Sequence, residues 1–149
     1  MGEVLTLMTN KELCEKYPFL MASVDDMFGE PIPFEERSYE NNWIEDIPRG
    51  WWEAFGIQMC EELLQILKRN NCIEDFYFLQ IKEKFGCLRF YPKEIPKEDS
   101  LRYYHWERKY EKLSKKTCFK CGKPATKQTS CWILPVCDSC YKEIEERRK

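Results

Sequence analysis

Four cysteines near the C-terminal end form two Cys-x-x-Cys pairs, and this pattern constrains the fold more than any other feature of the chain. The pairs are Cys118 with Cys121 and Cys137 with Cys140, and fifteen residues separate them. Thiolates with this spacing close a tetrahedral cage around one Zn²⁺ ion. Because four protein thiolates leave no coordination position open for water or substrate, we expect the ion to be structural.

The residues around these pairs predict a knuckle, a hairpin and a helix. Gly122 follows the first pair and can adopt the left-handed backbone conformation that turns amides toward a thiolate. Residues 125–130 and 131–134 are expected to form a short hairpin whose second strand ends at Pro135. Asp138 is then expected to cap a helix that carries the last ligand in its first turn. This order predicts a treble-clef or ribbon-like zinc module.

Redox-active dithiols are the alternative reading of the two pairs. The sequence around them is not thioredoxin-like, which favours zinc. Cys131 is expected to be a buried, small hydrophobic residue and not a ligand. With Cys131, five cysteines lie outside the pairs, and their scattered, odd-numbered arrangement does not fit a disulfide framework. We therefore expect a reducing, cytoplasmic environment.

Length and composition predict a folded body with a small appendage. The chain has 149 residues, of which 43% are hydrophobic and 34% are charged, which is enough for a core with a well-solvated surface. The longest apolar stretch, residues 17–24, is too short to span a bilayer, and no basic and apolar leader precedes it. A soluble protein without a membrane partner is expected. The predicted division is a body over residues 1–97 and a linker helix with the zinc module over residues 98–149.

The body is predicted to be α+β, with its helices arranged around an antiparallel hairpin. Thr9 to Glu12 is a capping box that starts a short helix, which Pro18 stops. A central helix over residues 51–69 and a later helix over residues 100–116 each show an apolar stripe at helical spacing. The stripe residues are Trp52, Phe55, Met59, Leu63 and Ile66 in the first helix, and Tyr103, Trp106, Tyr110 and Leu113 in the second.

The hairpin is predicted over residues 76–91, with a turn at Glu83 to Gly86. Alternation places Leu88 and Phe90 inward and Arg89 outward, as on an ordinary half-buried strand. The basic residues Lys82, Lys84 and Arg89 also alternate with aromatic residues such as Phe85, as on a surface that stacks bases and neutralises phosphates. The pattern leaves open whether this face is a plain strand surface or binds a partner.

A long irregular loop is predicted over residues 24–49. It contains three prolines and little periodicity, and Phe28, Phe34 and Trp43 are expected to pin it to the core. Loops of this length are often functional, although the aromatic residues could also simply cover an open side of the core.

Charge divides the chain into an acidic and a basic part. Residues 1–100 carry a net charge of −9, and residues 101–149 carry +7, which falls to +5 once four thiolates bind one Zn²⁺ ion. A basic zinc module fits contact with nucleic acid, but the same lysines also fit an ordinary solvated surface. The acidic part fits a basic protein partner.

Catalytic motifs are not found in the sequence. His105 is the single histidine and is expected to be a partly exposed helical residue. The carboxylate pairs Asp25-Asp26, Glu35-Glu36 and Glu61-Glu62 are adjacent residues, and such runs are usually solvated. The chain lacks a phosphate loop, a dinucleotide fingerprint and a His-Glu-x-x-His motif. We therefore expect a protein that is not an enzyme.

Three segments together resemble a family of small uncharacterised proteins of bacteriophages and related bacterial genomes. These are Gly50-Trp51 at a helix start, the hairpin phrase at residues 82–91, and the Cys-x-x-Cys-Gly-Lys-Pro segment at residues 118–124. The resemblance covers about residues 48–140. It implies a phage-type origin and the same domain plan, but it supplies no catalytic residues.

Three functions follow as expectations. The first is a non-catalytic accessory protein that binds and modulates a host or defence protein, for example as an inhibitor of host immunity. Its expected partner surface comprises Lys82, Lys84, Phe85, Arg89, Glu35, Glu36 and Trp43. The second is a nucleic-acid-binding zinc protein that uses the basic module and the hairpin. The third is an enzyme whose site has no recognisable motif. The sequence does not indicate an oligomeric state.

Overall fold

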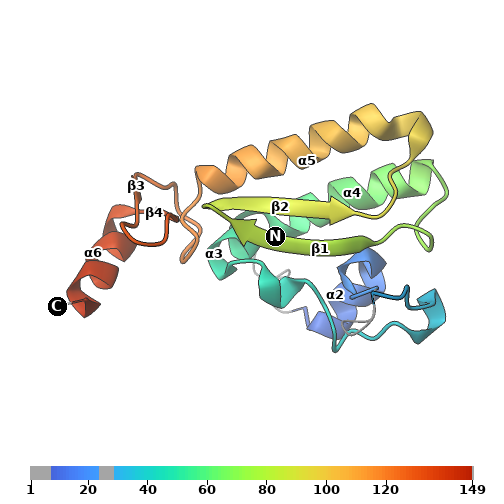
Figure 1. Ribbon diagram of the computed structural model, residues 1–149, viewed down its shortest axis with the longest axis horizontal. Coiled ribbons are helices and arrows are strands. Elements are labelled where there is room, and N and C mark those ends of the chain that lie inside the picture. Colours follow the sequence, from blue (N-terminus) through green and yellow to red (C-terminus); the bar gives the residue numbers. More distant parts are fainter. Residues whose placement is uncertain (1–7, 24–28, 149) are drawn as a thin grey trace.

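The computed structural model describes residues 8–23 and 29–148 and shows an α+β fold (Figure 1). The α-helices of the body are α2 (Asn10–Lys16), α3 (Arg49–Trp51), α4 (Ile57–Arg69) and α5 (Ser100–Lys115). Its strands are β1 (Phe78–Lys84) and β2 (Cys87–Pro92), and its short 3₁₀ turns are η1 (Pro18–Leu20), η2 (Phe34–Glu36), η3 (Ile44–Asp46) and η5 (Lys97–Asp99). The C-terminal module contains β3 (Lys127–Gln128), β4 (Pro135–Val136) and α6 (Asp138–Arg147).

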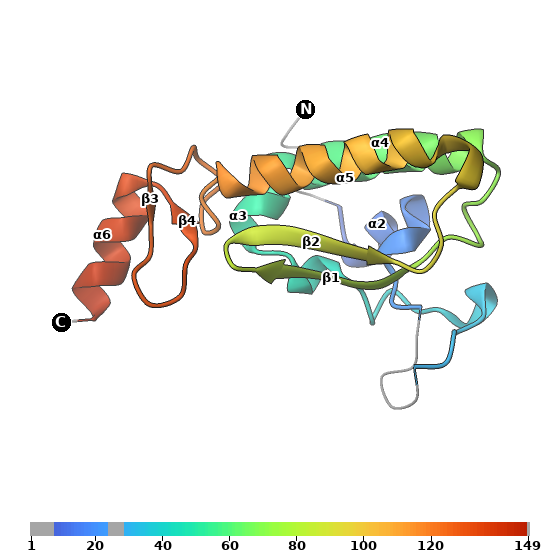
Figure 2. The same ribbon diagram turned by 45° about the horizontal axis from the view of Figure 1, so that its top comes forward.

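Helices α4 and α5 run side by side along the antiparallel hairpin, and the C-terminal module projects beyond one end of them (Figures 1 and 2). The hairpin turn points toward this module in both views. Figure 2 shows helix α2 on the same side of the hairpin as α4 and α5. Phe78 of β1 contacts Phe19, which follows α2, as well as Trp106 of α5. The helices of the body therefore cover one face of a two-stranded sheet.

Helix α2 follows the predicted capping box. The Thr9 hydroxyl accepts a hydrogen bond from the Glu12 amide at 3.1 Å, and the Glu12 carboxylate reaches back to the Thr9 amide. The helix ends before Pro18, which opens the 3₁₀ turn η1. Both predicted boundaries of this helix are confirmed.

The central helix is longer than predicted and contains a π-helical turn, η4 (Trp52–Gly56), between α3 and α4. A π turn adds a residue to one turn and shifts the helical phase. Trp51 is therefore fully buried, whereas Trp52, expected on the buried stripe, is only partly buried. Phe55 within the π turn and Met59 beyond it lie in the core as predicted. Asn71, just after the end of α4, has a φ of 50°, a left-handed conformation that is typical of a helix end.

The hairpin is confirmed, but its turn is tighter than predicted. Strand β1 continues through Glu83 and Lys84, and the two turn residues Phe85 and Gly86 have φ values of 54° and 77°. Positive φ at both positions is typical of a type I′ turn, which matches the twist of the flanking strands. Register pairs Ile81 with Phe90, both buried, so the alternation was predicted correctly.

An aromatic cluster forms the centre of the body's core. Trp106 of α5 contacts Phe90 of β2, with ring centroids 4.7 Å apart, and its indole N–H donates to the Met59 carbonyl of α4 at 2.8 Å. Phe78 and Tyr110 pack against the same indole. One side chain therefore holds the hairpin and both long helices together.

The predicted loop holds the two short turns η2 and η3, and the part of it that the structure describes begins at Gly29. Phe34 and Trp43 are partly buried, and Trp43 packs against the core, while Phe28 lies outside the described residues. The Trp43 amide donates to the Leu20 carbonyl at 2.8 Å. The second half of the loop is thus tied to the segment after α2.

The C-terminal hairpin differs from the prediction. Pro135 begins strand β4 and does not end a strand, pairing with Gln128 while Val136 pairs with Lys127. Residues 129–134 form the connection between the two strands. Proline is compatible with this position because β4 is an edge strand, where the missing amide leaves no ladder bond unmade.

Candidate metal centre

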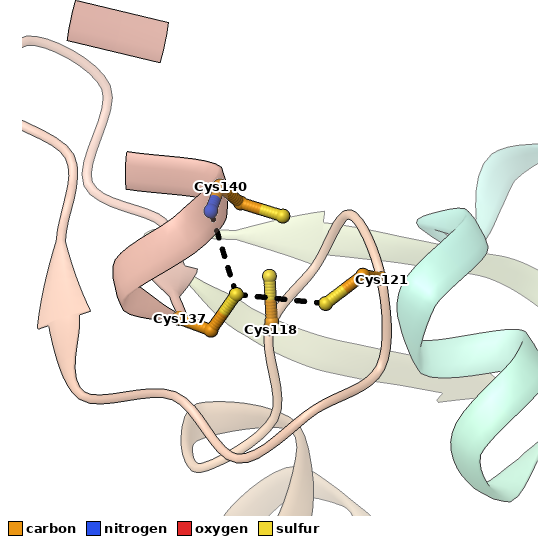
Figure 3. A group of neighbouring side chains, drawn as sticks. All are labelled: Cys118, Cys121, Cys137 and Cys140. Carbon is orange, nitrogen blue, oxygen red and sulfur yellow. Dashed lines mark hydrogen bonds between the residues drawn. The ribbon is translucent and has the colours of Figure 1, made fainter. Parts of the chain in front are cut away.

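The four cysteines of the two pairs meet at one point (Figure 3). Cys118 and Cys121 lie on the loop after α5, and Cys137 and Cys140 lie at the start of α6. Their Sγ atoms all lie within 4.8 Å of one another, and the Sγ atoms of Cys121 and Cys137 are 3.6 Å apart. The chain therefore forms a site able to bind one metal ion.

The geometry is compatible with zinc. In a tetrahedral site with zinc–sulfur bonds of ~2.3 Å, the sulfur atoms lie ~3.8 Å apart. The observed separations bracket this distance, so small rotations of the cysteine side chains suffice for coordination. The donors are four sulfur atoms, a set that suits zinc and other soft ions and does not suit Mg²⁺ or Ca²⁺.

Backbone hydrogen bonds shape the first pair into a knuckle. The Cys118 amide donates to the Lys123 carbonyl at 2.7 Å, and the Gly122 amide donates to the Cys118 carbonyl at 3.0 Å. Gly122 has a φ of 85°, the left-handed conformation that the sequence predicted. Thr117 and Pro124 form a β-bridge that closes the loop behind the cysteines.

The second pair is positioned by a helix start whose capping residue differs from the prediction. Cys137, not Asp138, is the N-cap of α6, and its Sγ atom accepts a hydrogen bond from the Cys140 amide at 3.5 Å (Figure 3). Asp138 is the first helical residue and accepts a hydrogen bond from the Thr126 hydroxyl. The positive end of the helix dipole and the free amides of the first turn stabilise a thiolate at this place.

Backbone amides also stabilise a thiolate in the first cysteine pair. Burial opposes ionisation of Cys118, but hydrogen bonds from the amides of Cys121, Cys137 and Lys120 outweigh it and lower the pKa of the Cys118 thiol to about 7. Burial and the neighbouring thiols instead raise the pKa of Cys140. Packed thiols that oppose each other's ionisation fit a site in which a cation completes the charge balance.

The module is fixed to the body through a contact between two glycines. The Gly50 amide donates to the Phe119 carbonyl at 2.7 Å, and a Cβ atom on Gly50 would lie 2.3 Å from the Cys118 carbonyl oxygen. A Cβ atom on Gly122 would lie 2.8 Å from the Gly50 carbonyl oxygen. Only residues without a side chain allow this approach. The Trp51 indole adds a hydrogen bond of 2.8 Å to the Thr117 carbonyl.

A second contact joins the module to the hairpin turn. The Trp132 indole donates to the Glu83 carboxylate at 3.1 Å, and the other oxygen of Glu83 accepts from the Gly86 amide at 2.8 Å. A Cβ atom on Gly86 would lie 2.8 Å from the Ile133 carbonyl oxygen. Sequence reasoning missed the roles of Gly50 and Trp132. For Gly50, the available signal was a glycine directly before the predicted helix start at Trp51. For Trp132, the sequence offers no such signal.

The predicted partner-binding residues lie in separate places. Lys84 and Phe85 lie at the hairpin turn beside the module, and Lys82 and Arg89 lie behind them on the outward face, where Arg89 pairs with Glu111 at 3.5 Å. The exposed residues Glu35 and Glu36 form η2, whose Phe34 lines a pocket with Lys68 and Asn71 at the C-terminal end of α4. This is the opposite end of the body (Figure 1).

The residues that were considered for catalysis differ in their surroundings. His105 is exposed in a groove between α4 and α5. The thiol of Cys87 on β2 is buried and contacts the Glu111 carbonyl and Ser114. Glu61 and Glu62 accept hydrogen bonds from the hydroxyls of Tyr17 and Tyr110 at 2.7 and 2.6 Å. The Tyr17 hydroxyl lowers the pKa of Glu61. The pair Asp25-Asp26 lies outside the described residues.

The cysteines outside the site differ in exposure. Cys14 and Cys60 are buried, and burial raises the pKa of both thiols. Cys131 is exposed, so the prediction that it is buried was wrong. It lies on the connection between β3 and β4, which lacks the apolar neighbours of a core.

Comparison of the chain with protein-family models, with curated proteins and with solved structures finds no match. Among the described residues, no helix combines the length and apolarity needed to cross a membrane.

Proposed function

We propose that this chain is a non-catalytic zinc protein whose surface binds and modulates a protein of a host cell or its defence. Four cysteines that can all bind one ion support the structural role, because such a cage has no open coordination position. The choice of a host or defence protein as target rests on the resemblance to phage proteins.

The identity of the metal and the class of the module belong to this proposal. A knuckle, a short hairpin and a helix that carries the last ligand are the parts of a treble-clef zinc module. We expect the purified protein to contain one zinc ion per chain by elemental mass spectrometry. Iron or a substoichiometric mixture of metals would contradict the zinc assignment.

One observation carries the proposed partner binding, an exposed apolar patch where the hairpin turn meets the module. Phe85, Trp132 and Ile133 have exposed fractions of 77%, 64% and 48%, and we call them the junction patch. Gly86 and Glu83 hold its two halves together through the contacts with Ile133 and Trp132. Clustered exposed apolar side chains are typical of interaction sites, because water contact with them is unfavourable.

A pull-down from host cells tests this proposal. Tagged protein is incubated with lysate, with and without nuclease and at two salt concentrations, and the bound proteins and nucleic acids are identified. We expect a stoichiometric protein that survives nuclease and that the double variant Phe85→Ser/Trp132→Ser no longer captures. The matched control is Leu101→Ser, an equally exposed apolar residue on α5. Retention of every captured protein by the double variant would contradict binding through the junction patch.

Nucleic-acid binding is the second candidate, and the hairpin turn favours it. The Lys84 Nζ atom lies 5.9 Å from the centre of the exposed Phe85 ring, which is an arrangement that can stack a base beside a phosphate. In the same pull-down, this function predicts nucleic acid that leaves as the salt concentration rises and proteins that leave with nuclease.

A further inference from the structure

A groove of about 970 Å³ lies between the body and the first cysteine pair. Three parts of the chain form its walls, which are residues 44–53 around the start of the long helix, Glu83 at the hairpin turn, and residues 119–121 of the knuckle. None of these parts forms the groove alone. It exists because the Gly50–Phe119 hydrogen bond holds the knuckle against the helix start.

Apolar side chains form much of the groove's lining. Ile44, Pro48, Trp52 and Phe119 all line it and are partly buried, so each presents some apolar surface to solvent. Trp52 is available because the π-helical turn moved it away from the core position that Trp51 occupies instead. This lining can bind aliphatic side chains by removing apolar surface from water.

Carboxylates outnumber cations along the groove. Glu45, Asp46, Glu53 and Glu83 line it together with Arg49 and Lys120. Both cations already have partners, since Arg49 pairs with Glu53 at 2.7 Å and Lys120 pairs with Glu143 at 2.8 Å.

Among the described residues, no salt bridge neutralises two of these four carboxylates, Glu45 and Glu83. Glu83 receives hydrogen bonds from an indole and a backbone amide, both neutral donors. Glu45 is exposed and forms no salt bridge within residues 8–23 and 29–148. The groove therefore combines apolar walls with excess negative charge.

We infer that this groove binds a basic, aliphatic segment of the partner protein, an inference that rests on the proposed partner binding. Arginine or lysine side chains pair with Glu45 and Glu83, while aliphatic side chains between them pack on Trp52 and Phe119. Glu83 also holds Trp132 of the junction patch, so groove and patch form one continuous surface.

The metal site contributes one wall of this groove. Phe119 and Lys120 lie between the ligands Cys118 and Cys121, and Cys121 itself lines the groove. Loss of the metal removes the constraint that fixes this wall. Binding of the basic segment therefore requires the metal-loaded protein.

Titration of the isotopically labelled, zinc-loaded full chain with a defined peptide tests the inference. The probe is a peptide of about eight alternating Arg and Leu residues, long enough in extended form to cross the groove. Two control peptides replace either every Arg by Glu or every Leu by Ser. We expect amide shift changes at residues 44–53, Glu83 and residues 119–121 with the probe, and none there with either control peptide.

Charge-neutral variants separate the groove from the general acidity of the body. The double variant Glu45→Gln/Glu83→Gln should weaken probe binding by about five- to tenfold, because the two lost ion pairs are together worth about 1 to 1.4 kcal/mol. Glu35→Gln/Glu36→Gln changes the net charge equally at the far end of the body and should leave the affinity unchanged. Zinc content and thermal unfolding confirm that both double variants are folded.

Each outcome decides the inference. Equal weakening by the two double variants, shift changes confined to other surfaces, or equal binding of the acidic peptide would overturn it. If the variant Glu45→Gln/Glu83→Gln still captures the host protein in the pull-down, the groove is not the binding site for that protein, while the proposed function stands. If the probe binds as expected but no variant or parent captures a protein, the proposed function fails and the groove remains a peptide site without that role.

Discussion

The body and the C-terminal module are stabilised by different means. The body's core combines aromatic and aliphatic residues from α2, both long helices and the hairpin. Among the described residues, the buried cluster of the module contains only Cys118, Val136, Cys137 and Cys140. A cluster this small cannot offset the loss of chain entropy on folding, so we expect the module to depend on a bound metal ion. Apolar burial stabilises the body, and we propose that metal coordination stabilises the module.

The comparison also shows how one region controls the surface of the other. The knuckle meets the start of the long helix at Gly50 and Gly122, and the module's connecting loop meets the hairpin turn at Glu83. The groove and the junction patch lie at these two contacts. The module therefore shapes the groove and the junction patch by its position, while the body supplies most of the residues.

Metal removal should separate the two regions most clearly. The variant Cys118→Ser lacks one ligand and is expected to lose the metal and unfold the module, at a cost of several of the ~10 to 16 kcal/mol available from such sites. Hydrogen exchange should increase over residues 117–148 and stay slow in α4 and α5. Unchanged zinc stoichiometry would contradict the ligand assignment, and the exposed Cys131→Ser serves as the matched control.

A core substitution in the body should have the opposite pattern. Trp106→Ala removes the indole that contacts Phe90 and Tyr110, which should lower the free energy of unfolding by about 3–5 kcal/mol. Denaturant titration followed by circular dichroism measures this change. The zinc content should remain one ion per chain at low denaturant. Release of zinc at the same denaturant concentration as the body unfolds would show that the two regions unfold together.

The glycine contact tests the coupling itself. In Gly50→Ala the added Cβ atom would lie 2.7 Å from the Gly122 amide nitrogen as well as close to the Cys118 carbonyl, so the knuckle must shift. Overpacking of this kind should cost about 1–3 kcal/mol. We expect weaker zinc retention against a competing chelator together with a lower melting temperature. Gln58→Ala, an exposed change on the same helix, should alter neither quantity.

A pH dependence of the body's stability should be the smallest of the four effects. Burial, and next the negative charge of Glu111, raise the pKa of Glu107 from an ordinary 4.5 to about 7, although Arg89 opposes the shift. The folded state then binds more protons than the unfolded chain between these values. The contribution of Glu107 is therefore fully present below pH 4.5 and is lost as the pH rises through 7.

The magnitude is about 1 kcal/mol, because the carboxylate is partly exposed and solvent screens it. Glu107→Gln should remove this dependence and make the body more stable at pH 8 than the parent chain. Thermal unfolding of the core, followed at several pH values, measures it. The exposed substitution Glu98→Gln should retain the parent's pH profile, and an identical profile for Glu107→Gln would refute the prediction.

Local patterns were predicted well. The capping box at Thr9, the inward positions of Leu88 and Phe90, and the meeting of the four cysteines depend on neighbouring residues or on ligand spacing. The predicted strand boundaries of the C-terminal hairpin were wrong, because a strand of two residues is too short to show the alternation by which strands are recognised. The prediction that Cys131 is buried was wrong, because the hydrophobicity of a thiol does not indicate whether its loop packs against the core.

The sequence by itself determined the metal-binding set, the helices and the hairpin, because helical periodicity, strand alternation and Cys-x-x-Cys spacing are local properties. Tertiary structure decided which surfaces these elements share. The π turn that exchanges Trp52 for Trp51, the contact of Gly50 with Gly122 and the pairing of Trp132 with Glu83 each depend on residues distant in the chain. Such contacts leave no periodic pattern, since they result from how preformed elements pack.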